Sequence, residues 1–91
     1  MIRSVDPHVS FPATDPARAY RFYTGMLGMT PVYTSHERGF HIFQGSEPTP
    51  TVIGVHRHDG PIAPPEMQHV WVWLGVEEIA PVRSRLEEAG V

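Results

Sequence analysis

The feature of this 91-residue sequence that most constrains its fold is a pattern that occurs twice, about sixty residues apart. In each copy a histidine, His8 or His69, begins a β-prone segment, and an acidic residue follows seven or eight positions later. A helical pattern then runs to a glycine, Gly28 in the first copy and Gly90 in the second. Self-similarity at a fixed period indicates that one supersecondary unit is repeated.

The first copy predicts a strand, a helix and then three strands. Residues 8–14 alternate, with apolar side chains at odd positions and His8 on the opposite face. Asp15 followed by Pro16 predicts a helix start, because the carboxylate can accept hydrogen bonds from free N–H groups and proline fits the first helical position. Gly28 can adopt the left-handed conformation that ends a helix. Turn-forming residues then separate three expected strands, at 29–35, 40–44 and 51–58.

The second copy is shorter than the first. Its strand would place His69, Trp71 and Trp73 on one face, and its helix would begin near Glu78 and end at Gly90. Only one residue follows that glycine, so either the chain is a fragment or the protein has lost the end of its second unit. We therefore expect an α+β fold: a βαβββ module at 1–58, a connecting loop at 59–66 and an incomplete second βα module at 67–91.

The composition excludes several classes of function. The net charge is −3 with lysine and arginine scattered, so the sequence offers no basic patch for nucleic acid. No apolar run is long enough to span a membrane, and the N-terminal residues lack the apolar core of a secretory signal. There is no cysteine and hence no disulfide framework. We expect a cytoplasmic protein whose chemistry depends on six histidines, ten acidic residues and the hydroxyl groups.

The segments HVSFPATDPARAYRFYTGMLGM and QHVWVWLGVEEIAPVRSRLEEAGV together resemble the vicinal oxygen chelate superfamily. That superfamily includes glyoxalase I, bleomycin- and fosfomycin-resistance proteins, methylmalonyl-CoA epimerase and extradiol dioxygenases. The resemblance implies paired βαβββ modules that form a cup around a divalent metal, which chelates two neighbouring substrate oxygens. It also implies that His8 and His69 are metal ligands. A third ligand, a glutamate late in the second module, would lie beyond Val91 or come from a partner chain.

The sequence departs from glyoxalase I at one position. The extra acidic ligand of that enzyme matches Gly54 here, which favours a dioxygenase-like set of two histidines and one carboxylate. If Gly54 faces the cup, then His56 and His58 lie on the same side of their strand. Either could act as a ligand or as a general base, and His56 is our candidate for the catalytic role. The alternative interpretation is that HRHDG is the solvated end of a strand.

These residues lead to two principal hypotheses. The first is an enzyme that uses Fe²⁺, Mn²⁺, Ni²⁺ or Zn²⁺ and acts on a small substrate with vicinal oxygens, in either a dioxygenase-like or a lyase- or isomerase-like reaction. The second is a metal-free binding or resistance-type protein that sequesters an aromatic ligand against Trp71 and Trp73, with Gly54 and His58 also lining the pocket. Those tryptophans could equally fill space or cover an interface, and His8 and His69 could simply bond the backbone. A third possibility is a non-functional truncation. In every case we expect a homodimer, because an incomplete module leaves a sheet edge unpaired.

Overall fold

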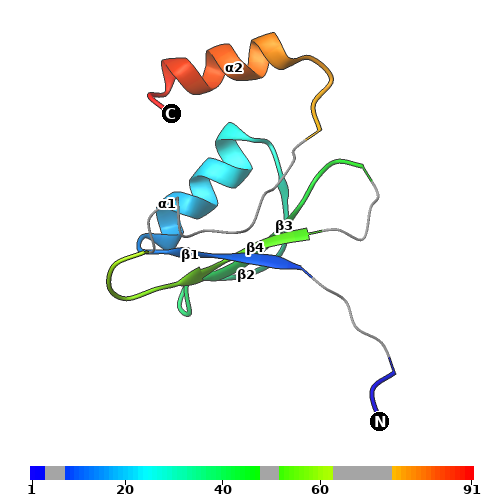
Figure 1. Ribbon diagram of the computed structural model, residues 1–91, viewed down its shortest axis with the longest axis vertical. Coiled ribbons are helices and arrows are strands. Elements are labelled where there is room, and N and C mark those ends of the chain that lie inside the picture. Colours follow the sequence, from blue (N-terminus) through cyan, green and yellow to red (C-terminus); the bar gives the residue numbers. More distant parts are fainter. Residues whose placement is uncertain (4–7, 48–51, 63–74) are drawn as a thin grey trace.

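The described part of the protein, in a computed structural model, comprises residues 1–3, 8–47, 52–62 and 75–91. Within it lie a four-stranded sheet and two helices, the first of which continues into a π-helical turn (Figure 1). The strand expected to contain His69, Trp71 and Trp73 falls outside these ranges. The elements are β1 (Val9–Ala13), α1 (Pro16–Arg21), the π-helical turn η1 (Phe22–Met26), β2 (Thr30–Ser35), β3 (Phe40–Gln44), β4 (Val52–Arg57) and α2 (Ile79–Glu88).

The strands follow the spatial order β1-β4-β3-β2. The outer strand β1 runs parallel to β4, whereas the other neighbours are antiparallel. In the parallel pair Ser10 lies opposite Gly54 and Pro12 lies opposite His56. The prediction of one strand, one helix and three further strands is therefore confirmed, with strand ends that differ from expectation by one residue or less.

The alternating pattern of β1 separates an apolar face from a polar one. The apolar face lies beneath α1, as Figure 1 shows, and its core consists of Phe43, Ile53 and Val55. Phe11 and Tyr23 pack against that core, the Tyr23 ring stacking on Phe43. The opposite face carries the even-numbered residues of β1, so burying one face leaves the histidine-bearing face free for other contacts.

The first helix begins and ends where the sequence predicts. The Asp15 carboxylate accepts a hydrogen bond from the Arg18 N–H at 3.1 Å, and Pro16 occupies the first turn. Gly28 has a φ of 66°, a left-handed conformation that glycine adopts without strain. The last turn is π-helical, because the Leu27 N–H donates to the Phe22 carbonyl at 3.0 Å. The sequence does not predict this turn.

The second helix follows Glu78 directly and is succeeded by Gly90, whose φ is 78°. Its apolar stripe is only partly covered, because Val82 and Leu86 are half-buried and Ile79 is 74% exposed. The Arg85 guanidinium of α2 donates a hydrogen bond to the Gly25 carbonyl of η1 at 2.8 Å. No helix in the described ranges is long and apolar enough to cross a membrane.

Candidate functional site

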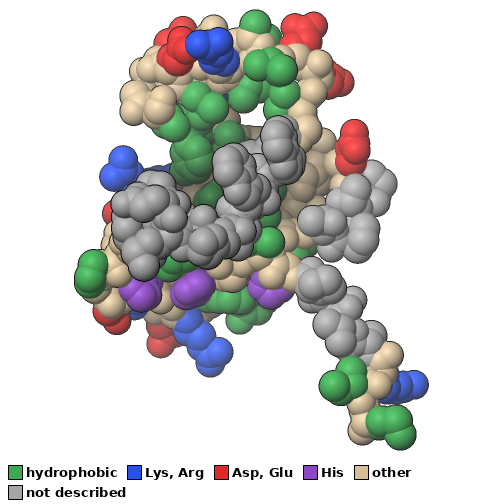
Figure 2. Space-filling model, in the orientation of Figure 1, with side chains coloured by type: hydrophobic (Ala, Val, Ile, Leu, Met, Phe, Trp, Pro, Cys, Tyr) green, Lys and Arg blue, Asp and Glu red, His purple; other side chains and the backbone are tan. Residues whose placement is uncertain are grey.

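Three of the residues singled out from the sequence meet on the sheet face turned away from α1. His8 immediately precedes β1, while Gly54 and His56 lie on the neighbouring strand β4. The parallel register places Ser10 beside Gly54, so this face carries His8, Ser10, Gly54 and His56 within two adjacent strands. Figure 2 shows histidine side chains gathered along this side of the molecule. Gly54 thus lies on the same face of the sheet as His8 and Ser10.

A hydrogen bond joins Ser10 to His56. The distance from Ser10 Oγ to His56 Nδ1 is 2.8 Å, and both side chains are half-buried. The proton can lie on either atom: Ser10 donates if Nδ1 is unprotonated, and the imidazole donates if Nδ1 carries hydrogen. In the second arrangement Nε2 keeps its lone pair and can accept a proton from another molecule. The bond thus fixes the ring and couples its tautomer to Ser10.

Gly54 provides space between these side chains. A Cβ placed on Gly54 would lie 3.5 Å from Ser10 Oγ and 3.6 Å from His8 Cδ2. It would also lie 3.3 Å from the His41 carbonyl oxygen, which is closer than most side chains approach backbone. A larger residue would therefore displace His8 or Ser10. Glycine, which is buried here, lets both side chains pack close to β4.

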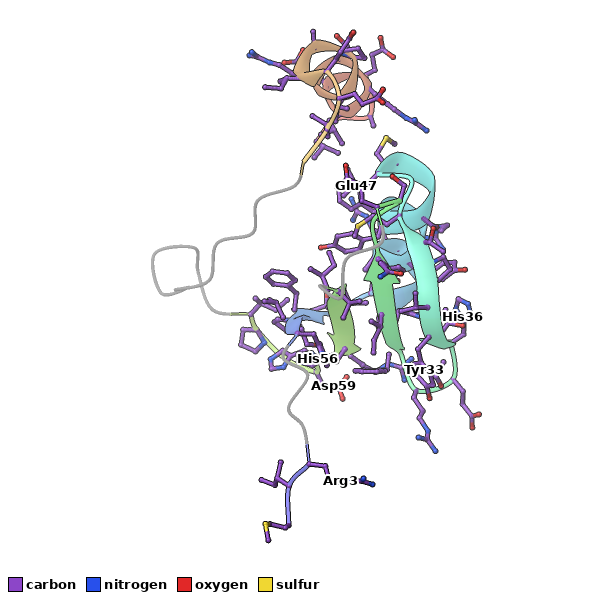
Figure 3. All side chains as sticks on the ribbon, turned by 90° about the vertical axis from the view of Figure 1, so that its right-hand side faces the viewer. Arg3, Tyr33, His36, Glu47, His56 and Asp59 are labelled. Atoms are coloured by element: carbon purple, nitrogen blue, oxygen red, sulfur yellow. The ribbon has the colours of Figure 1, made fainter. Side chains whose placement is uncertain are left out.

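His58 lies just beyond β4 and is held in the following turn. Its Nε2 is 3.2 Å from the carbonyl oxygen of Pro61, and its backbone N–H donates to the Ala13 carbonyl at 3.0 Å. Asp59, labelled beside His56 in Figure 3, is exposed. This geometry agrees with the alternative interpretation of HRHDG as a strand end entering a turn. A pocket role for His58 stays a prediction.

Of the two histidines proposed as metal ligands, only His8 lies within the described residues. His8 is exposed and has no hydrogen-bond partner within the described ranges, so its imidazole is free to bind a ligand. His69, Trp71 and Trp73 lie outside those ranges. Among the residues that are described, no three histidine, aspartate or glutamate side chains converge on a possible metal position. An imidazole on an open polar face suits a divalent metal, but further ligands must come from elsewhere.

Two groups of residues on this sheet were not assigned a role from the sequence. Ser10 is one, although its even-numbered position on the strand places it beside His8. The other is the pair Tyr33 and Phe40, whose rings lie 5.7 Å apart and which the register places on the same face as His56. The contact of Ser10 with His56 and that of Tyr33 with Phe40 both depend on which strands are neighbours, and the sequence alone does not identify them.

The match to known proteins covers most of the chain. The family model for the Glyoxalase/Bleomycin resistance protein/Dioxygenase superfamily matches residues 7–91. No match was found among curated proteins. The sequence similarity is therefore to a superfamily rather than to an individual member.

Solved structures share this fold at low identity. One is the genomically encoded fosfomycin resistance protein FosX from Listeria monocytogenes, with a TM-score of 0.69 and 18% identity over 100% of this chain and 69% of that one. Another is the bleomycin resistance determinant encoded on the transposon Tn5, with a TM-score of 0.61 and 17% identity over 97% of this chain and 67% of that one. An integron cassette protein from the mobile metagenome of the Halifax Harbour sewage outfall gives a TM-score of 0.69 and 19% identity, covering 98% and 72%. These likenesses concern the fold alone.

Proposed function

Because the chain belongs to the Glyoxalase/Bleomycin resistance protein/Dioxygenase superfamily, we propose that it is a divalent-metal-dependent enzyme acting on a small substrate with two neighbouring oxygen atoms. His8 and His69 bind the metal in this proposal, with a carboxylate from elsewhere in the protein or from a partner chain as a third ligand. His56 is the general base. The metal is Fe²⁺, Mn²⁺, Ni²⁺ or Zn²⁺.

The observation that supports this proposal most strongly is the placement of the Ser10–His56 pair beside His8 on an open face. A general base needs a fixed ring and one nitrogen free to accept a proton. The 2.8 Å hydrogen bond fixes the ring through Nδ1, which leaves Nε2 for the substrate. The absence of a side chain at Gly54 lets His8 and Ser10 lie close together over β4, which brings the proposed ligand near the proposed base.

The chemistry divides between the metal and the side chains. A divalent metal, when bound, would polarise a substrate oxygen as a Lewis acid. His56 accepts a substrate proton at Nε2, and Ser10 Oγ accepts the Nδ1–H hydrogen bond, which becomes charge-assisted once the ring is protonated. His8 would hold the metal, and Gly54 allows His8 and Ser10 to pack close to β4.

A chromogenic catechol tests the proposal. 4-Nitrocatechol carries two neighbouring oxygens, and its absorbance shifts when both bind a metal ion. We expect a shift when it is added to protein loaded with Fe²⁺ under anaerobic conditions, and no protein-dependent shift in the His8→Gln variant. The matched control is His36→Gln, which removes an exposed histidine from the turn after β2, well separated from His56 (Figure 3). Equal shifts in all three proteins would refute the assignment of His8.

A metal-free binding protein is the second candidate, and one observation favours it. The aromatic pair Tyr33 and Phe40 shares the face of His56. Such a protein would hold an aromatic ligand with these rings and with Trp71 and Trp73. Its binding of 4-nitrocatechol would quench tryptophan fluorescence equally with and without EDTA. Loss of quenching in EDTA would instead support the metal-dependent enzyme.

A further inference from the structure

A second histidine pair lies on the opposite side of the sheet. His36 is the first residue of the turn after β2, and His41 lies on β3 opposite Val55, so its side chain faces α1. The two imidazole centroids are 4.8 Å apart and the planes are tilted by 57°. Tyr20 from α1 lies against both, with its ring 4.8 Å from that of His36 and 5.0 Å from that of His41.

His41 lacks the partners that a buried polar group normally has. Its side chain is 0% exposed, and neither ring nitrogen has a hydrogen-bond partner within the described structure. Leaving a buried donor or acceptor unpaired costs about 1 to 3 kcal/mol, so such groups usually mark an absent water, ion or ligand. The burial of these unpaired atoms points to a ligand that would bond the ring nitrogens of His41.

The spacing of the two rings fits one metal ion between them. With metal–nitrogen bonds of about 2.0 to 2.1 Å, two imidazoles on adjacent positions of a tetrahedral or square-planar ion have centroids about 4.5 to 5.2 Å apart. The observed separation lies inside this range. Tilted rings are also compatible, because the nitrogen lone pairs lie in the ring planes and a stacked pair could not share an ion.

We propose that His36 and His41 form a second metal site, selective for divalent ions that prefer imidazole nitrogen: Cu²⁺, Ni²⁺ or Zn²⁺. Water completes the coordination from the exposed side of His36. Burial and the neighbouring His36 lower the pKa of His41, which keeps its ring in the neutral form that metal binding requires. Figure 3 shows His36 beside β2, well separated from His56, so this site is distinct from the face proposed for catalysis.

Copper titration of the full chain tests this site, because Cu²⁺ binds nitrogen ligands most tightly among these ions. Calorimetry should show one Cu²⁺ equivalent whose affinity falls in His36→Gln. Changes to residues that only support a ligand already cost about 10- to 100-fold in affinity. Removing one of the two ligands should therefore cost at least about tenfold. His36 is exposed in a turn, so this variant should fold normally.

Two controls keep the result specific. His58→Gln removes another histidine in a turn and should leave the affinity unchanged. In His8→Gln the His36-dependent equivalent should persist, which separates this site from the proposed catalytic metal. Substoichiometric Cu²⁺ should also broaden the NMR signals of the Tyr20 ring. If wild-type protein and His36→Gln bind Cu²⁺ equally, or if the Tyr20 signals stay sharp, the proposal is wrong.

Discussion

The Ser10–His56 hydrogen bond makes one tautomer of His56 suitable for proton transfer and the other unsuitable. If Nδ1 carries the proton and donates to Ser10 Oγ, the free nitrogen Nε2 is basic. If Ser10 donates instead, Nε2 is protonated in the neutral ring and cannot accept. Ser10 is therefore a positioning residue in the proposed mechanism, and its effect on the ring is measurable without a substrate.

We predict that neutral His56 is protonated at Nδ1. Nitrogen-15 NMR of the imidazole should show this tautomer in the wild type and a mixture in Ser10→Ala. That variant should lose only about 0.5 to 1.5 kcal/mol of stability, as expected for one neutral hydrogen bond. Ser10→Thr keeps a hydroxyl and should retain the wild-type tautomer. A wild-type ring protonated at Nε2 would contradict the assignment of His56 as the base.

His41 predicts a pH dependence of stability. Burial, and then the nearby His36, lower its pKa in the folded state, so the unfolded chain binds the proton more readily. The stability that neutral His41 contributes is therefore fully present at a pH above the unfolded-state pKa of about 6.5. It decreases as the pH falls below that value. Tyr20 and His36 are the titratable side chains in ring contact with His41. Urea unfolding between pH 7.5 and 5 should show a smaller decrease in His41→Phe than in the wild type, and equal decreases would contradict this account.

At the level of elements, the turn between β2 and β3 depends on Gly39. Its φ is 64°, and a Cβ there would lie 2.9 Å from Pro16 Cγ and 2.9 Å from Arg57 Nε. The arginine side chain can move, but the proline ring at the start of α1 cannot. Gly39 therefore allows the turn to approach both the helix start and the end of β4.

Gly28 separates backbone strain from crowding. It has a similar φ of 66°, and apart from its two chain neighbours no atom of the described residues lies within 4 Å of the place that a Cβ would occupy. We predict a stability loss of about 1 to 2 kcal/mol for Gly28→Ala, from strain alone. Gly39→Ala should lose about 2 to 5 kcal/mol, since overpacking adds to the strain. Chemical denaturation measures both, and equal losses would show that the contact with Pro16 is unimportant.

Local patterns in the sequence predict the helices and strands well, but they do not predict the contacts between one element and another. The alternation in β1, the Asp15–Pro16 start and the glycine ends are local signals, and each is found where expected. The Ser10–His56 bond joins residues 46 positions apart and depends on β1 pairing with β4. The buried His41 was missed for a related reason, since its burial requires Tyr20 from α1 to lie above β3. Neither contact has a local signal.

For the whole molecule, exposed apolar side chains favour self-association. Ile79 on α2 is 74% exposed, and Val76 just before that helix is 45% exposed. We predict a homodimer of twice the 10.2 kDa chain mass in sedimentation equilibrium. Ile79→Lys should shift the equilibrium toward monomer, whereas Ser84→Lys on the same helix should not. A stable wild-type monomer would refute the prediction.

The central claim is that His8 binds the metal of a catalytic site on the face opposite α1, and counting bound metal tests it most directly. Mn²⁺ binding should be measured by electron paramagnetic resonance in the His36→Gln background, which removes the second proposed site. In that background we predict one bound Mn²⁺ per catalytic site, and its loss when His8→Gln is added. Equal Mn²⁺ binding with and without His8, or no binding in either protein, would contradict the account.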